Sequence, residues 1–196
     1  MLLDDLKSIL STSLTPEIKS DSRYRLASVL VVIYGQSPTI IMTEKPKSMK
    51  YHAGEISFPG GKLDAMDSDL LQTALRETSE ELGLDVSKDN VVGQLTPVMT
   101  LNSGFLIYPF VSILNEIPTL TANSEVEKIL HIPLNPLLQT ISKDVDPSHN
   151  LKDEMYTFEY QNQIVWGASA RILKQIESKI NSILNLNDSI CYFLLP

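Results

Sequence analysis

The segment from Ser68 to Leu82 most constrains how this chain can fold, because it combines helical periodicity with a cluster of acids. On a helix that advances about 100° per residue, the packing positions fall on one narrow stripe, formed by Leu71, Leu75, Thr78 and Leu82. The acids Glu77, Glu80 and Glu81 spread over about 100° of a different face. The segment therefore predicts a helix that packs on one side and presents carboxylates on the other.

The acidic face calls for a compensating cation. Like charges at this spacing destabilise a helix by a few tenths of a kcal/mol per pair. Gly83 and the apolar Leu84 predict the end of the helix, which places Glu80 and Glu81 at the unfavourable negative end of its dipole. A divalent ion such as Mg²⁺ or Mn²⁺ prefers such oxygen ligands. The alternative is an acidic face that is simply solvated.

Composition restricts the class of protein. The 196 residues, 43% hydrophobic and 20% charged, indicate one folded domain over residues 1–196, with a helical extension in residues 1–20. The net charge of −8 disfavours nucleic acid and anionic membranes as partners. The single cysteine, Cys191, excludes an intramolecular disulfide and the usual thiolate zinc site. No apolar run approaches the roughly 20 residues of a membrane span, so a cytoplasmic location is expected.

Hydrophobic patterns predict a mixed α/β architecture. The expected helices cover residues 2–14, 68–82 and 167–184, and the expected strands cover residues 25–35, 39–43, 91–100, 105–114, 126–132, 154–160 and 163–166. Strands and helices do not alternate strictly along the chain. This order favours an α/β layered fold with a mixed sheet over a doubly wound parallel sheet.

Residues 44–62 have no clear periodicity and are expected to form a basic loop. From residue 45 to residue 62, four lysines against one glutamate give a net charge of +3 in a chain whose total is −8. A basic segment beside an acidic metal site suits a polyanionic substrate, although exposed lysines can also serve solubility alone. The pair Gly60–Gly61 at its end can bring bare backbone close to a metal or a phosphate.

The acidic helix resembles the Nudix box. The second half of that family's pattern, Arg-Glu-apolar-x-Glu-Glu-x-Gly-apolar, is matched by Arg76, Glu77, Glu80, Glu81, Gly83 and Leu84, with Thr78 at the usually apolar position. The first half departs, since Gly61 lies one residue further from Arg76 than in the general pattern. Either Asp67 or Asp69 stands where the pattern has its isolated glutamate.

A second block resembles one branch of the family, the coenzyme A pyrophosphatases. Residues 50–61 read Lys-Tyr-His-Ala-Gly-Glu-Ile-Ser-Phe-Pro-Gly-Gly, like the upstream motif of that branch, in which the extra residue after the glycine pair is usual. Lys50 stands where the branch commonly has arginine, which keeps the charge but loses a planar fork for phosphate. Further segments starting at Ser103, Glu125 and Ile164 extend the resemblance over about residues 24–175.

The resemblance implies a Nudix-like α/β/α fold and a metal-dependent hydrolase. Water would attack the pyrophosphate of coenzyme A or acyl-coenzyme A, giving 3′,5′-ADP and (acyl-)4′-phosphopantetheine. The implied Mg²⁺ or Mn²⁺ ligands are Glu77, Glu80, Glu81 and the carbonyl of Gly61. Arg76 is expected to position a carboxylate, and Glu125 is a candidate extra ligand or general base. The expected substrate-binding residues are Lys45, Lys47, Lys50, His52, Gly60, Gly61 and Lys62, with the lysines of residues 45–50 meeting the 3′-phosphate.

Two other functions remain open at this point. The chain could hydrolyse another nucleoside diphosphate derivative, such as an ADP-sugar or a dinucleotide. It could also be a non-catalytic nucleotide-binding sensor, although a pure binder has no need of three clustered acids. The expected partner is a small molecule, and a homodimer is compatible with the sequence. Trp166 and Phe58 are expected to pack in the core or to support the basic loop.

Overall fold

The structure is a computed structural model that describes residues 2–17, 24–48, 53–101, 103–146 and 155–193, with side chains described as far as Ile183. Its elements in chain order are α1 (Leu3–Leu10), β1 (Arg25–Tyr34), β2 (Thr39–Glu44), β3 (Ile56–Ser57), β4 (Gly60–Lys62), α2 (Leu70–Leu82), the short 3₁₀ helix η1 (Lys88–Asn90), β5 (Val91–Gln94), β6 (Val98–Met99), β7 (Phe105–Leu114), β8 (Lys128–Pro133), α3 (Leu134–Gln139), β9 (Ser142–Lys143), β10 (Tyr156–Tyr160), β11 (Gln163–Val165) and α4 (Gly167–Phe193).

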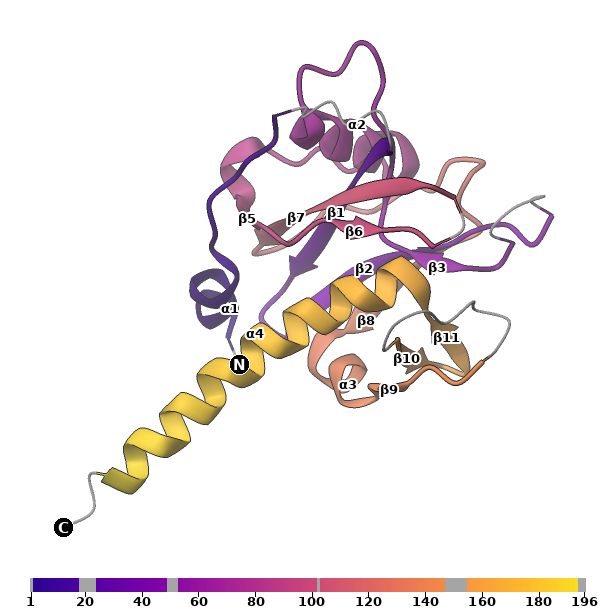
Figure 1. Cartoon of the computed structure of the whole chain (residues 1–196). Helices are drawn as coiled ribbons and strands as arrows, with labels where there is room; N and C mark the ends of the chain where they lie inside the picture. Colours follow the sequence, from indigo (N-terminus) through magenta and orange to yellow (C-terminus); the bar gives the residue numbers. More distant parts are fainter. Residues whose placement is uncertain (1, 18–23, 49–52, 102, 147–154, 194–196) are drawn as a thin grey trace.

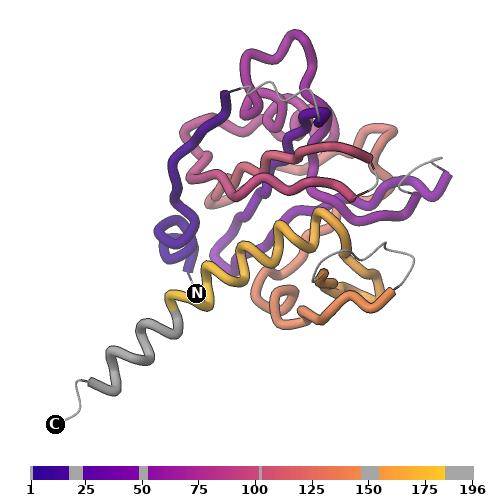
Figure 2. Tube along the Cα trace, viewed as in Figure 1, coloured from indigo at the N-terminus to yellow at the C-terminus, as the bar shows by residue number. Residues whose placement is uncertain are grey.

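A mixed sheet, eight-stranded within the described residues, forms the centre of the fold. Its middle strands β1 and β7 run parallel side by side from the pair Arg25–Phe105 to the pair Tyr34–Leu114, although they lie far apart in sequence (Figure 2). The other strand pairs of this sheet are antiparallel. On its second side, β1 pairs with β4 through residues 27–29 and with β2 through residues 33–34. This arrangement fixes the Gly60–Gly61 backbone against the central strand.

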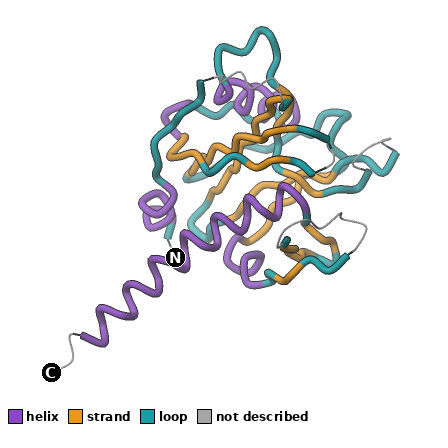
Figure 3. The backbone as a smooth tube through the Cα atoms, viewed as in Figure 1, coloured by secondary structure: helices purple, strands orange, loops and turns teal. Residues whose placement is uncertain are grey.

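Helices cover both faces of the sheet. Alternate residues of a strand point to opposite sides, and apolar residues on both sides of the sheet need cover from water. In β1, Leu30 and Val32 join the apolar cluster under α2, whereas Val31 and Ile33 join the cluster that includes residues of α1 and α4. Figure 1 shows α2 on one side of the sheet and α4 on the other, and Figure 3 shows the same layers by type of element. The expected α/β/α fold with a mixed sheet between helices is confirmed.

Several predicted boundaries were wrong for local reasons. The strand expected over residues 91–100 is divided into β5 and β6, with Pro97, which has no N–H for a ladder hydrogen bond, between them. The expected loop 44–62 contains β3 and β4, and residues 134–143 contain α3 and β9; elements this short show little periodicity. The first helix is shorter than residues 2–14, and the last extends beyond residue 184.

A smaller sheet of β9, β10 and β11 lies beside the N-terminal part of α4. Phe158 of β10 is buried in the same apolar cluster as residues of α4. In the part of the chain that the structure describes, no helix combines the length and the apolar character needed to cross a membrane.

Candidate active site

Helix α2 carries the acidic face, and both of its ends are fixed by the sequence. The Asp69 side chain accepts a hydrogen bond from the backbone N–H of Gln72 and caps the first turn. Gly83 ends the helix in the left-handed conformation, with φ of 64°. The buried side includes Leu71, Ala74 and Leu82, so the helix is held against the sheet with its acids toward the Gly60–Gly61 segment.

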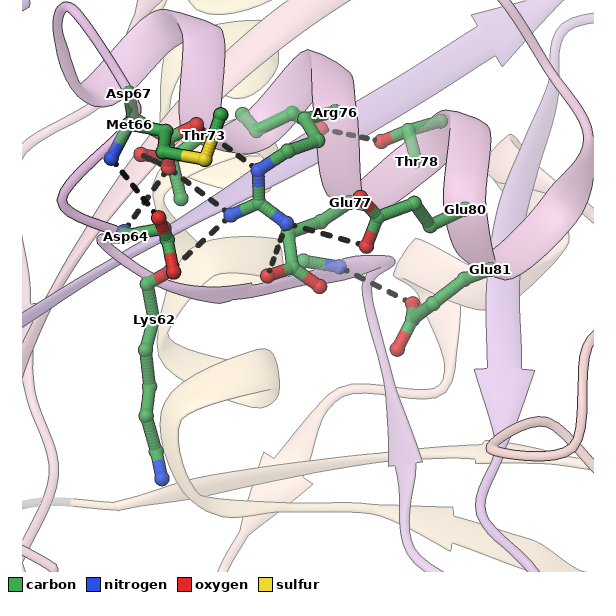
Figure 4. A network of polar contacts seen from close by, with 12 residues as sticks. Lys62, Asp64, Met66, Asp67, Thr73, Arg76, Glu77, Thr78, Glu80 and Glu81 are labelled. Carbon is green, nitrogen blue, oxygen red and sulfur yellow. Dashed lines mark hydrogen bonds and ion pairs between the residues drawn. The ribbon is translucent and has the colours of Figure 1, made fainter.

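Arg76 gathers three carboxylates around one guanidinium (Figure 4). Its Nε and Nη2 atoms each lie 2.9 Å from an oxygen of Asp67, in a two-bond arrangement. Its Nη1 atom donates to Glu77 Oε1 at 3.0 Å and to Glu80 Oε2 at 3.2 Å. Arg76 therefore fixes two acids of the helix and ties them to the preceding loop.

The two candidates for the outlying acid have different roles. Asp67 has a side chain only 1% exposed and bonds to Arg76, while Asp69 is the helix cap. Hydrogen bonding from Arg76 lowers the pKa of Asp67 to about 2, against the opposing effect of its burial. Of the two aspartates, Asp67 is therefore the one that pairs with the arginine of the helix, whereas Asp69 begins the helix.

Glu81 lies deeper than the other two acids of the helix. Its side chain is 2% exposed, accepts a hydrogen bond from Lys45 Nζ at 2.7 Å and accepts another from the Gly60 N–H at 3.2 Å. Burial raises the pKa of Glu81, although Lys45 and the Gly60 N–H oppose the rise. Lys45 was predicted to meet substrate, but in this structure its ammonium contacts the carboxylate cluster.

Glu77 is packed against the backbone of Gly61. A Cβ atom added at Gly61 would collide with the Glu77 carboxylate, so only glycine leaves room for that side chain in this position. Burial raises the pKa of Glu77, while Arg76 acts in the opposite direction. Gly61 thus brings its bare backbone into contact with a partly buried carboxylate.

Substitutions of the two glycines should differ in their effects, one on stability and the other on activity. At Gly60, where φ is 152°, a Cβ would collide with the Ser28 carbonyl and the Val29 backbone, so we expect Gly60→Ala to lower the free energy of unfolding by about 1–3 kcal/mol. We expect Gly61→Ala to unfold near the wild-type temperature but to lose activity, because only the Glu77 side chain must move. Thermal denaturation and the measurement of kcat distinguish the two variants. Full activity of Gly61→Ala would show that the close contact of Gly61 with Glu77 is not needed for catalysis.

The donors suit a divalent cation by type. Carboxylates and the Gly61 carbonyl are the oxygen ligands that Mg²⁺ and Mn²⁺ prefer, and burial, which raises the pKa of Glu77 and of Glu81, makes their charged forms costly without a nearby cation. Within the described ranges, no three Asp, Glu, His or Cys side chains are gathered closely enough to hold a metal as they stand. Glu80 is turned to Arg76 and Glu81 to Lys45. Metal binding would therefore require Glu80 and Glu81 to turn from these cations toward the ion.

The other predicted site residues lie at different distances from this cluster. Glu125 is exposed in the loop before β8, and its charge contributes to the raised pKa of Glu81. Lys47 is exposed beside Gly54. Lys62 follows the glycine pair, and its side chain extends away from the carboxylates (Figure 4). Lys50 and His52 lie outside the described residues.

A cleft of about 490 Å³ opens beside the glycine pair. Lys45, Gly60, Gly61 and Glu125 belong to its polar lining, and its apolar lining includes Phe105, Met155 and Trp166. Phe58 is buried as predicted, and both Phe58 and the half-buried Trp166 line the cleft. The sequence did not indicate this apolar lining, because it comes from strand ends and a loop that meet only in the fold. The one sequence feature that pointed to this lining was the resemblance of residues 103–105 and 164–168 to the coenzyme A branch.

The layered α/β/α fold holds a carboxylate helix against a glycine pair beside a cleft, and this arrangement suits the hydrolysis of a phosphate anhydride. Residues 24–149 match the NUDIX domain family. The chain belongs to the Nudix hydrolase family and is thus a pyrophosphohydrolase acting on a nucleoside diphosphate derivative.

Curated relatives support the family, and a solved structure shares the fold. The uncharacterized Nudix hydrolase NudL of Photorhabdus laumondii subsp. laumondii is 33% identical over 168 residues, which cover 84% of this chain and 89% of the relative. That of Yersinia enterocolitica is 32% identical over 165 residues, covering 83% and 84%. The crystal structure of a MutT/nudix family protein from Enterococcus faecalis aligns with a TM-score of 0.58 at 13% identity, over 88% of this chain and 66% of that one. This last likeness concerns the fold alone.

Proposed function

We propose that this Nudix hydrolase cleaves the pyrophosphate of coenzyme A or acyl-coenzyme A, giving 3′,5′-ADP and (acyl-)4′-phosphopantetheine. The observation that carries the proposal is the mixed lining of the cleft, in which charged side chains such as Lys45 and Glu125 occur together with apolar side chains such as Met155 and Trp166. A nucleotide joined through a diphosphate to a long, partly apolar arm would use both kinds of lining. The resemblance of residues 50–61 to the coenzyme A branch supports the same substrate.

In this proposal each residue of the cluster has a defined task. Glu77, Glu80 and Glu81, with the Gly61 carbonyl, would hold Mg²⁺ or Mn²⁺. The ion supplies neutralisation of phosphate charge and polarisation of the attacking water. Arg76 keeps Glu77 and Glu80 oriented through its bonds at 3.0 and 3.2 Å. Glu125 is proposed as an extra ligand or as the general base, since it lines the same cleft.

The substrate is tested by mass-spectrometric product analysis. The protein is incubated separately with coenzyme A, acyl-coenzyme A, ADP-ribose and NADH, in Mg²⁺ and in Mn²⁺. We expect the coenzyme A compounds to be cleaved fastest. Faster cleavage of ADP-ribose or NADH would replace the proposal with a different nucleoside diphosphate substrate. Ligand binding without metal and without turnover would favour a nucleotide sensor.

Metal binding should be visible without activity. A ligand at 100 times its dissociation constant stabilises a folded protein by about 2.7 kcal/mol, which is roughly 5–10 °C for a chain of this size. We therefore expect Mg²⁺ or Mn²⁺ to raise the melting temperature of the wild type and to have a much smaller effect on Glu77→Gln. The exposed Glu159 lies on β10 outside the cleft and provides the control Glu159→Gln. Equal shifts in all three proteins would contradict the metal assignment.

A further inference from the structure

We propose that Arg25 and Lys62, held against the Phe105 ring, bind a second phosphate group of the substrate, a phosphomonoester on the ribose of the nucleotide. This inference rests on the proposed function and refines it. It transfers the recognition of the 3′-phosphate from the lysines of residues 45–50 to a different part of the fold. The three residues come from the ends of three strands.

Strand pairing brings these residues together on one face. Arg25 and Phe105 are opposite each other in the parallel pair of β1 and β7, and Lys62 of β4 is opposite Ala27 of β1. Residues two apart in a strand point to the same side, so Arg25 and Ala27 share a face with Lys62 and Phe105. Ala27, Lys62 and Phe105 all line the cleft.

Both cations contact the same aromatic ring. The Arg25 Cζ atom lies 4.2 Å from the centroid of the Phe105 ring, and the Lys62 Nζ atom lies 5.7 Å from it. Both distances are within the range of cation–π contacts. Arg25 also donates a hydrogen bond to the backbone carbonyl of Ser103. Two like charges gathered on one ring repel each other, and a bound anion would remove that repulsion.

The charges of this pair are not neutralised by carboxylates in the part of the chain that the structure describes. Among the described residues, neither Arg25 nor Lys62 forms an ion pair with Asp or Glu, whereas Lys45 is paired with Glu81 and Arg76 with Asp67. Both Arg25 and Lys62 are exposed. They therefore remain available for a phosphate dianion, which accepts charge-assisted hydrogen bonds from guanidinium and ammonium groups.

The position of the pair fits a group next to the pyrophosphate. Lys62 directly follows Gly61, whose backbone contacts the Glu77 carboxylate of the proposed metal site. Figure 4 shows the Lys62 side chain extending from this point away from the acids. In coenzyme A the same ribose carries the pyrophosphate and the 3′-phosphate. The 3′-phosphate would therefore lie near the cleaved bond, on the side toward which the Lys62 side chain extends. Nucleotides that lack such a phosphate would leave both cations unused.

Binding of the nucleotide product gives a direct test. Trp166 is the only tryptophan and lines the cleft, so its fluorescence can follow titrations with 3′,5′-ADP and with 5′-AMP. We expect the wild type to bind 3′,5′-ADP at least about 10-fold more tightly, because one charge-assisted contact has roughly that effect on affinity. Arg25→Gln and Lys62→Gln should each reduce this preference several-fold, and more strongly at low salt. Lys7→Gln, which removes a charge from α1 outside the cleft, should leave it unchanged.

Kinetics separate the failure of this inference from the failure of the proposed function. With coenzyme A and its dephospho form as substrates, Arg25→Gln and Lys62→Gln should lower kcat/KM for coenzyme A and approach the wild-type value for the dephospho form. If coenzyme A is cleaved but both variants keep the wild-type preference, the phosphate site is wrong and the proposed function stands. If coenzyme A is not cleaved but 3′,5′-ADP binding still depends on both cations, the phosphate site stands and the proposed substrate is wrong.

Discussion

Glu81→Gln and Glu80→Gln should each lower kcat by on the order of a thousandfold. Each substitution removes one negative charge from the donor set without changing side-chain volume. Charge stabilisation by a metal at a phosphoryl centre contributes several kcal/mol to the transition state, and about 4 kcal/mol corresponds to three powers of ten in rate. Steady-state kinetics at saturating Mg²⁺, with Glu159→Gln as the control, measure the effect.

The two variants should differ in stability, since the two side chains differ in burial. The Glu80 side chain is 56% exposed, so Glu80→Gln should unfold near the wild-type temperature. Glu81 is 2% exposed and pairs with Lys45, so its replacement should cost about 1–3 kcal/mol by leaving a cation without its partner. Wild-type turnover in both variants would rule out the carboxylate face of α2 as the catalytic centre.

Arg76→Ala should cause the largest loss of stability among surface-accessible positions around the site. It would leave the Asp67 carboxylate, 1% exposed, without its ionic partner. Removing one member of a buried pair costs about 3–5 kcal/mol, and the 28% exposure of Arg76 favours the lower end. A loss of about 3 kcal/mol corresponds to roughly 6–12 °C in the melting temperature. Lys88→Ala gives the control, because it removes the ion pair with Asp69 at 3.9 Å but leaves the Asp69 helix cap in place, and it should cost under about 1 kcal/mol.

The same ion pair predicts a specific dependence on pH. The pKa of Asp67 is about 2 in the folded protein, below its ordinary value of 3.8. A lowered carboxyl pKa contributes stability above the unfolded value, and this contribution is lost as the pH falls from about 4 toward 2. The shift corresponds to about 2 kcal/mol. Urea titrations of wild type and Asp67→Asn between pH 6 and pH 2 should converge on acidification; parallel curves would contradict the assignment.

Local features of the fold were predictable from the sequence, and pairings between distant segments were not. The α2 helix and its stop at Gly83 follow from spacing and from a single residue type. The sequence could not distinguish Asp67 from Asp69, because the choice depends on which side chain faces Arg76 in the folded loop. Likewise, the contact of Lys45 with Glu81 depends on how the end of β2 lies beside α2, so the sequence did not indicate it.

The contact of Arg25 and Lys62 with the Phe105 ring could not be predicted from the sequence either. Arg25 and Phe105 are 80 residues apart in the sequence and meet because β1 pairs with β7 in one register. A shift of one residue would turn either side chain to the other face of the sheet. The sequence therefore indicated the type of fold and the acids of the site, but not the walls of the cleft that select the substrate.

Isotope labelling tests most directly whether water cleaves the pyrophosphate of coenzyme A at this site. Coenzyme A is hydrolysed in ¹⁸O-enriched water by the wild type and by Glu81→Gln, and the products are analysed by mass spectrometry. We predict 3′,5′-ADP and 4′-phosphopantetheine, with one ¹⁸O atom in one of the two new phosphate groups, and almost no product from the variant. Free pantetheine with an intact nucleoside diphosphate, or equal labelled product from the variant, would contradict the account.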